Sequence, residues 1–190
     1  MVYESLIAIV ESHLNDLTKT WVQEVKKSEY LSSYQKLEEK ELYLRGYVLF
    51  NNLLNWLLKG ASNDDAAVYF KKIGEDRINE GAPLTEVYYA LHLEKKVLWS
   101  YVAWKDEVAG ILKAYDAIEF MTVINNYFDL GNFYIIKGYN ENLYIKLADS
   151  NKFEKDELEQ LFVSGALYQE SIKTVKEKMY SEALSIGIIR

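Results

Sequence analysis

The two histidines of the chain, His13 and His92, are the side chains best suited to ligate a metal or haem iron. His92 falls in the middle of a predicted helix, from which an imidazole can bind haem. Neither histidine has a second ligand-type residue at a metal-binding spacing, and the sequence contains no Glu-x-x-His pair of the kind that di-iron helical bundles need. We interpret both as structural histidines, predict no metal site, and keep His92 as the haem ligand of an alternative interpretation.

Arg77 and Glu94 are candidates for a buried charge pair. Each falls on the apolar stripe of one of two adjacent predicted helices. Because a buried charge costs several kcal/mol unless it is paired, the two side chains can satisfy each other across the helix contact. The alternative places one or both at the edge of the stripe, with the charged head in water.

Aromatic side chains are in excess, with sixteen tyrosines, four tryptophans and seven phenylalanines. Tyrosine combines an apolar body with a polar tip and therefore suits half-polar pockets and protein interfaces. One long predicted helix concentrates these residues. The candidates for a ligand pocket or a dimer interface are Tyr127, Phe128, Tyr134 and Tyr139, and the sequence leaves open which of the two they form.

Catalytic motifs are absent from the sequence. It contains no serine nucleophile elbow, P-loop, dinucleotide-binding fingerprint or His-Glu-x-x-His motif. The absence of cysteine excludes disulfides, thiol catalysis and cysteine-ligated metals, and it suits a reducing compartment. We therefore predict a binding module with no cofactor, not an enzyme. A small enzyme that uses tyrosine or glutamate acid–base chemistry is a third interpretation.

Charge and hydropathy limit the partners. The net charge of −7 comes with scattered Lys and Arg residues, so no basic stripe is present to follow a nucleic acid backbone. The amino-terminal stretch lacks the basic start and cleavage site of a signal peptide, and no run approaches the roughly 18 apolar residues of a membrane span. We expect a cytoplasmic protein that binds neither nucleic acid nor a membrane.

Apolar residues at steps of three and four predict that helices carry all of these side chains. One proline and nine glycines are too few for the turns of a sheet protein. The pattern predicts an all-α bundle of five to six helices, with a long fifth helix and a C-terminal helix. The expected ranges are 3–27, 36–59, 62–81, 83–104, 112–149 and 154–185, with Gly131 and Gly138 as a candidate bend in the fifth.

Two regions are expected along the chain. Residues 1–150 form a helical sensor-like domain, and residues 151–190 form an amphipathic helix that packs on the bundle or acts as a dimer or linker helix. The last run repeats apolar positions at alternating steps of three and four, as in a heptad pattern. This predicted helix seam contains Leu161, Tyr168, Ile172, Val175 and Met179.

The segment FKKIGEDRINEGAPLTEVYYALHLEKKVLWSYV, residues 70–102, resembles the middle of the RsbT co-antagonist (RsbR-type) N-terminal sensor domains of bacterial signalling proteins. The shared features are an Arg-x-x-x-Gly element, here Arg77 and Gly81, a small turn, and a helix rich in leucine and charge. The stretch NNYFDLGNFYIIKGYNENL, residues 125–143, resembles the long fifth helix of that family. With Trp21 of the first helix, the likeness covers roughly 140 residues.

The resemblance implies a non-enzymatic, dimeric sensory module that is related in shape to globins, usually without haem. In such families the C-terminal helix relays the state of the sensor to a separate effector, and the family context implies a role in stress-response regulation. From this resemblance we expect a signalling domain that acts through protein–protein interaction and dimerisation, with a second copy, a signalling protein and a small molecule as its partners. The alternative is a globin-like carrier or sensor that holds haem or another small ligand through His92.

Overall fold

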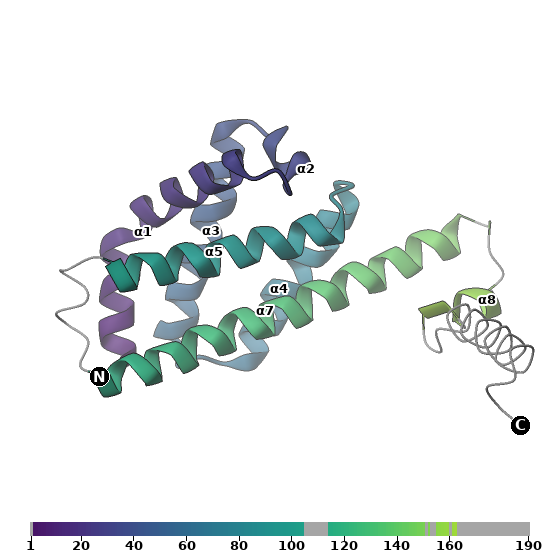
Figure 1. Cartoon of the computed structure of the whole chain (residues 1–190). Helices are drawn as coiled ribbons and strands as arrows, with labels where there is room; N and C mark the ends of the chain where they lie inside the picture. The colour runs from purple at the N-terminus through teal and green to yellow at the C-terminus, as the bar shows by residue number, and fades with distance from the viewer. Residues whose placement is uncertain (1, 105–113, 151, 153–154, 160, 163–190) are drawn as a thin grey trace, which may run out of the picture. The chain divides into compact units, whose positions relative to one another are not determined.

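The computed structural model describes residues 2–104, 114–150, 152, 155–159 and 161–162, and every element in this part of the chain is helical (Figure 1). The predicted all-α bundle is therefore confirmed. Five helices are long: α1 (Val2–Lys27), α3 (Glu39–Leu58), α4 (Asn63–Asn79), α5 (Leu84–Trp104) and α7 (Ala114–Asp149). Two are short: α2 (Ser32–Gln35) and α8 (Lys155–Glu159). None of these described helices combines the length and apolarity that a bilayer crossing requires.

The chain divides into two compact units, residues 1–141 and 142–190. The division falls inside α7, earlier than the boundary at residue 150 that the sequence pattern predicts. In the first unit α7 is anchored on α4, where Lys71 forms an ion pair of 2.7 Å with Glu141. That contact lies at the last residue of the first unit.

The core of the first unit contains the apolar stripe that predicts α1. All six of its members are buried: Leu6, Val10, Leu14, Leu17, Trp21 and Val25. Trp21 is 2% exposed, and its indole N–H donates to the carbonyl of Ala90 in α5 over 3.1 Å. Gly46 of α3 makes room for this ring, because a Cβ at that position would lie 2.7 Å from it.

The ends of α4 and the start of α5 carry residues that commonly stop and start helices. The Ser62 side chain caps α4 by accepting from the backbone N–H of Asp65, although the bond is long at 3.5 Å. Gly81 follows α4 with φ +77°, in the left-handed region that favours glycine. Pro83 then immediately precedes α5, as its missing N–H predicts.

A short helix forms where the sequence pattern predicts only an interruption. The carboxylate of Glu86, in the first turn of α5, accepts from the Ser33 N–H at 2.8 Å and from the hydroxyls of Ser33 and Ser32 at 2.6 and 2.9 Å. Burial opposes the charge, but these hydrogen bonds outweigh it and lower the pKa of Glu86. The carboxylate therefore holds the start of α2 in place.

Glu86→Gln is expected to lower the free energy of unfolding at neutral pH by about 1 kcal/mol, because the amide replaces charge-assisted hydrogen bonds with weaker ones. A lowered folded-state pKa contributes stability above the unfolded-state pKa, and that contribution is lost as pH falls through the folded value. Urea unfolding at several pH values should show the difference shrinking in acid. The surface variant Glu39→Gln, at an exposed carboxylate that pairs with Lys26, is expected to change stability much less, because water screens such pairs.

Helices α4 and α7 approach each other at glycines. A Cβ on Gly74 would lie 2.2 Å from the carbonyl oxygen of Ile135, and one on Gly138 would lie 2.2 Å from that of Lys71. Gly131 in turn faces the ring of Phe70. The helix is continuous through both Gly131 and Gly138, which serve as contact points for α4 within α7.

Helix α5 runs beside α7 in the opposite direction (Figure 1). Lys95 of α5 contacts Asp129 of α7 at 3.2 Å, and the ring of Trp99, further along α5, packs on Phe120, nearer the start of α7. With α4 on another side of α7, these helices surround the region in which the candidate site lies.

The second unit contains the end of α7, the short helix α8 and residues 161–162. Leu158 is fully buried, Leu161 is partly buried, and the ring of Phe162 packs edge-on against Tyr144 at 5.6 Å between centroids. The other members of the predicted helix seam, Tyr168, Ile172, Val175 and Met179, lie outside the described residues.

Candidate functional site

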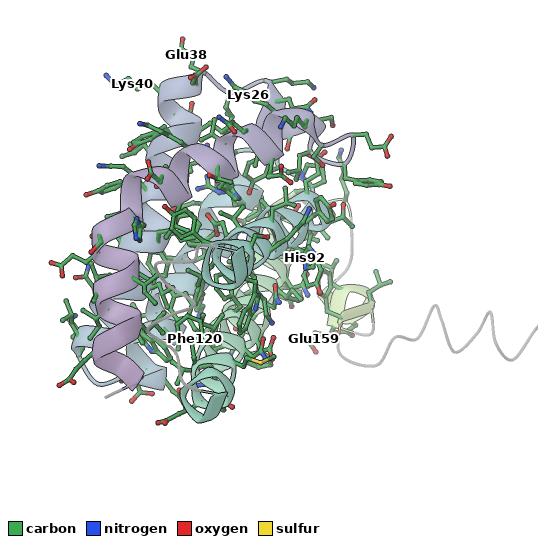
Figure 2. The ribbon with its side chains drawn as sticks, turned by 60° about the vertical axis from the view of Figure 1, so that its left-hand side comes forward. Lys26, Glu38, Lys40, His92, Phe120 and Glu159 are labelled. Atoms are coloured by element: carbon green, nitrogen blue, oxygen red, sulfur yellow. The ribbon has the colours of Figure 1, made fainter. Side chains whose placement is uncertain are left out.

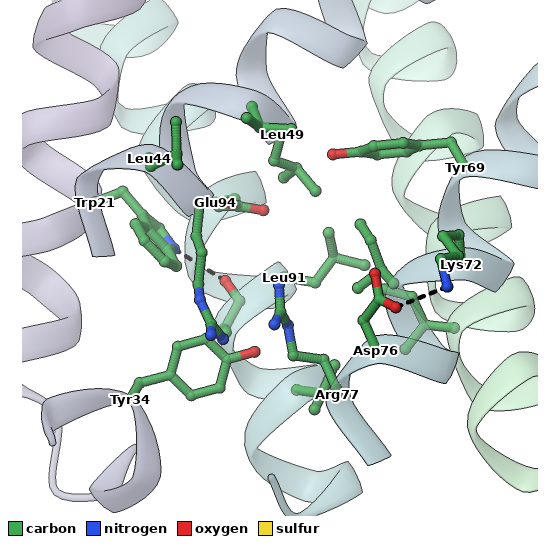
Figure 3. A pocket seen from close by; sticks show the side chains of 16 residues that line it. Trp21, Tyr34, Leu44, Leu49, Tyr69, Lys72, Asp76, Arg77, Leu91 and Glu94 are labelled. Atoms are coloured by element: carbon green, nitrogen blue, oxygen red, sulfur yellow. Dashed lines mark hydrogen bonds and ion pairs between the residues drawn. The ribbon is translucent and has the colours of Figure 1, made fainter. Parts of the chain in front are cut away.

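A pocket of about 300 Å³ opens in the first unit (Figure 3). Its walls come from six helices, and they combine apolar side chains with groups of both charges. The aromatic walls are Trp21, Tyr34 and Tyr69, and the charged side chains are Arg45, Lys72, Asp76, Arg77 and Glu94. This volume lies at the lower end of the range for small-molecule sites.

Glu94 lies deepest among the charged groups of the pocket. Its side chain is 4% exposed and faces the interior of the pocket in Figure 3. No hydrogen bond or ion pair within 4 Å reaches its carboxyl from any residue that the structure describes. Burial raises the pKa of Glu94 well above its usual range, and the nearby Arg77 guanidinium opposes that rise only in part.

The predicted pair of Arg77 and Glu94 lines one pocket but does not form an ion pair. Arg77 instead bonds both carboxylate oxygens of Glu80, three residues later, at 2.5 Å. The reason is local. Glu80 lies three residues after Arg77, so its carboxylate is next to the guanidinium, and the two groups can bond while both stay partly in contact with water. The side chain of Arg77 is 15% exposed and that of Glu80 is 41% exposed.

The other basic side chains of the pocket also have acidic partners. Arg45 contacts Glu41 at 2.5 Å and Glu80 at 2.9 Å. Lys72 contacts Asp76 at 2.8 Å, the ion pair drawn in Figure 3. Glu94 is therefore the pocket carboxyl that has no basic partner among the described residues.

Two tyrosine hydroxyls face the same space as Glu94 (Figure 3). Tyr34 is 5% exposed, and burial raises its pKa to about 12, although Arg77 and Arg45 oppose the rise. Burial also raises the pKa of Tyr69, with the nearby Glu94 adding to the effect. Neither hydroxyl has a hydrogen-bond partner in the described part of the chain, so both are available to a ligand.

Of the four aromatics predicted for a pocket or a dimer interface, three are buried in the first unit and one is partly buried. Tyr127 and Phe128 are at most 1% exposed, Tyr139 is 9% exposed, and Tyr134 is partly buried against the core. The hydroxyl of Tyr127 donates to Asn52 at 3.3 Å, and that of Tyr139 donates to the carbonyl of Ala82 at 2.9 Å. None of the four lines the pocket.

The two histidines lie apart from the pocket. His92 is exposed and stacks on Tyr89 at 5.7 Å between ring centroids (Figure 2). His13 pairs through Nδ1 with the hydroxyl of Tyr101 at 3.1 Å. Within the described residues, no group of three metal-ligating side chains is close enough to hold an ion.

Sequence reasoning identified Arg77 and Glu94 but missed the other polar residues of the pocket. Tyr34 follows a pair of serines that indicates a loop. Arg45 and Tyr69 lie within predicted helices, where nothing in the neighbouring residues indicates a binding or catalytic site. The one signal in the sequence was the presence of a charged residue on the apolar stripe of a helix, and only Glu94 and Arg77 of the pocket residues were identified by it. Compared with protein-family models, curated proteins and solved structures, the chain gives no match.

Proposed function

We propose that this chain is a non-catalytic sensory domain of a bacterial signalling protein, and that a small molecule bound in the pocket around Glu94 is its stimulus. The observation that carries the proposal is a carboxyl group 4% exposed that faces a pocket of about 300 Å³ and has no partner among the described residues. An unpaired buried carboxyl destabilises a fold, and proteins retain such groups at functional sites.

Binding is favoured over catalysis by the residues around this carboxyl. The side chains that line the pocket include no histidine, serine, threonine or cysteine, so a hydroxyl or thiol nucleophile activated by a histidine base is not found among them. The proposed class is the RsbT co-antagonist type of sensor domain, which is expected to act in stress-response regulation. In the haem alternative the axial ligand is His92, which is exposed and does not line the pocket.

Closing the mouth of the pocket tests the proposal. Val48 lines the pocket and is 44% exposed, so Val48→Trp adds a large side chain at the entrance without disturbing the core. We expect thermal unfolding in the presence of matched amines, alcohols and carboxylates to identify compounds that stabilise the fold. At a concentration one hundred times its Kd, such a compound should raise the free energy of unfolding by about 2.7 kcal/mol. Val48→Trp should abolish that stabilisation.

The matched control is Val68→Trp, because Val68 is 74% exposed on α4 and does not line the pocket. This variant should respond to the compounds as the unmodified protein does. Equal stabilisation of all three proteins would place binding elsewhere and contradict the proposal, as would the absence of any stabilising compound.

The proposed signalling role includes dimerisation through the long helices. In the first unit α7 exposes three large apolar side chains, Met121, Phe133 and Ile136, at 48%, 60% and 37%. Size-exclusion chromatography with light scattering should give twice the mass of one chain, and Phe133→Glu should shift the protein towards the monomer because it places a charge in the interface. Leu58→Glu, at a residue 61% exposed at the end of α3, is the control. A monomer at high concentration would contradict this part of the proposal.

A further inference from the structure

The charges of the pocket select the kind of ligand that it can hold. Its basic side chains already have carboxylate partners: Arg77 has Glu80, Arg45 has Glu41 and Glu80, and Lys72 has Asp76. An anion entering the pocket would therefore compete with carboxylates of the protein for each of these cations. An anionic ligand is disfavoured by that competition.

A cation meets the opposite situation. The Glu94 carboxyl is 4% exposed, faces the pocket and has no basic partner among the described residues. Bringing a positive charge against it supplies the partner that a buried carboxylate needs and that the fold does not provide. The hydroxyls of Tyr34 and Tyr69 face the same space and can accept further hydrogen bonds from a protonated amine (Figure 3).

The aromatic walls suit a cation as well. Trp21, Tyr34 and Tyr69 line the pocket, and the face of an aromatic ring attracts a positive charge within about 6 Å. The fold itself uses this attraction, because the Arg45 guanidinium lies 5.8 Å from the centroid of the Tyr34 ring. The apolar side chains of Leu49, Ile73 and Leu91 leave room for a hydrophobic body behind the charged head.

We infer that the pocket binds a small organic cation, an amine with an apolar or aromatic body, whose protonated nitrogen pairs with the Glu94 carboxylate between the tyrosine hydroxyls. The inference rests on the proposed function, because it names the ligand class of the same pocket. Glu94 is then the residue that selects ligands by charge.

Binding of an amine should release a proton. Burial favours the neutral form of Glu94 in the empty pocket, whereas a bound ammonium favours the carboxylate. The titratable and charged groups that face Glu94 across the pocket are Tyr34 from α2, Arg45 from α3, and Tyr69, Lys72, Asp76 and Arg77 from α4. The three basic groups each have a carboxylate partner, and burial raises the pKa of both tyrosines. Glu94 is therefore the group that we expect to release the proton when an amine binds.

Titration calorimetry with ligands that differ only in the head group tests the inference. The probes are phenethylamine, 2-phenylethanol and 3-phenylpropionate, together with butylamine, butanol and butyrate. We expect the amines to bind with proton release, measured in buffers of different ionisation enthalpy, and the alcohols and carboxylates to bind much more weakly. Glu94→Gln should weaken amine binding about thirtyfold or more, as the loss of one partner of a buried charge pair does.

The matched control is Glu24→Gln, at an α1 carboxylate that pairs with Lys96 at 3.3 Å and does not line the pocket. Its amine affinity should stay within about twofold of the unmodified protein. If alcohols or carboxylates bind instead, or if Glu94→Gln leaves amine binding unchanged, the cation inference fails while the ligand-binding proposal stands. If no probe of any charge binds, both fail.

Discussion

Replacing Gly74 with alanine is expected to lower the free energy of unfolding by about 3 kcal/mol, the upper part of the usual range for overpacked cores. The added Cβ would lie 2.2 Å from the Ile135 carbonyl oxygen and 2.7 Å from the Tyr139 nitrogen. Both are backbone atoms of α7, so no side-chain rotation relieves the clash and the two helices must separate. The intrinsic preference of a helix for alanine over glycine, about 1 kcal/mol, offsets only part of the loss.

Urea unfolding measures this effect, and Gly138→Ala provides an independent check because its Cβ would lie 2.2 Å from the Lys71 carbonyl oxygen. The double variant should lose less than the sum of the two, since one displacement of α4 from α7 relieves both clashes. The control is Gly60→Ala, where no atom lies within 4 Å of the added Cβ and the cost of about 1 kcal/mol comes from the positive φ alone. A Gly74→Ala protein as stable as the original would contradict the close helix contact.

Replacing Glu94 with methionine is expected to stabilise the protein by about 1–3 kcal/mol at neutral pH. Methionine fills a similar volume without a polar group, so the variant removes the desolvation cost of a carboxyl that has no partner among the described residues. The matched control is Glu86→Met, because Glu86 is also a buried glutamate of α5 but accepts three hydrogen bonds from Ser32 and Ser33. That variant should be destabilised, so two identical substitutions in one helix are expected to have opposite signs.

The pH dependence of stability gives a second measure of the same group. Because the folded-state pKa of Glu94 is raised, its contribution to stability is fully present below the unfolded-state pKa and is lost as pH rises towards the folded value. The stability of the unmodified protein relative to Glu94→Gln should therefore fall as pH rises from the unfolded-state pKa of an ordinary glutamate towards the raised folded-state pKa, by at most about 1.4 kcal/mol per pH unit. Marked destabilisation by Glu94→Met would instead indicate that Glu94 pairs with Arg77 inside the fold.

These two substitutions also separate stability from function. Glu94→Met should raise the unfolding temperature while removing the group that we propose to hold the ligand. Gly74→Ala should lower the unfolding temperature although it substitutes no residue that lines the pocket. A protein that becomes more stable and loses binding is the expected behaviour of a residue retained for a ligand.

The helices could be predicted from the sequence because helix formation depends on neighbours three and four residues apart. The apolar spacing of α1 and the junction of Gly81 and Pro83 appear in the structure where the pattern places them. Helix α2 could not be predicted in this way. Its four residues are held by Glu86, more than fifty positions later, and no local pattern contains that contact.

The candidate site was only partly predictable. Two charged residues on apolar stripes, Arg77 and Glu94, signalled a polar feature in the core, but their spacing contains no information about which partner each one takes. Arg77 bonds Glu80 for a local reason, because that carboxylate is three residues away, whereas the place of Glu94 in the pocket wall depends on how α4 lies against α5. The roles of Tyr34 and Tyr69 depend on the same packing.

By itself, the sequence determined that this chain is built from helices, where the main turns fall, and which charged residues were unusual for their positions. These properties are set by interactions within a few residues along the chain. The tertiary structure alone decided that α4 and α7 meet at Gly74 and Gly138, and that Glu94 faces a pocket without a basic partner in the described part of the chain. Both features depend on distances between segments that are far apart in the sequence. Those distances are fixed by how the helices of the first unit pack together.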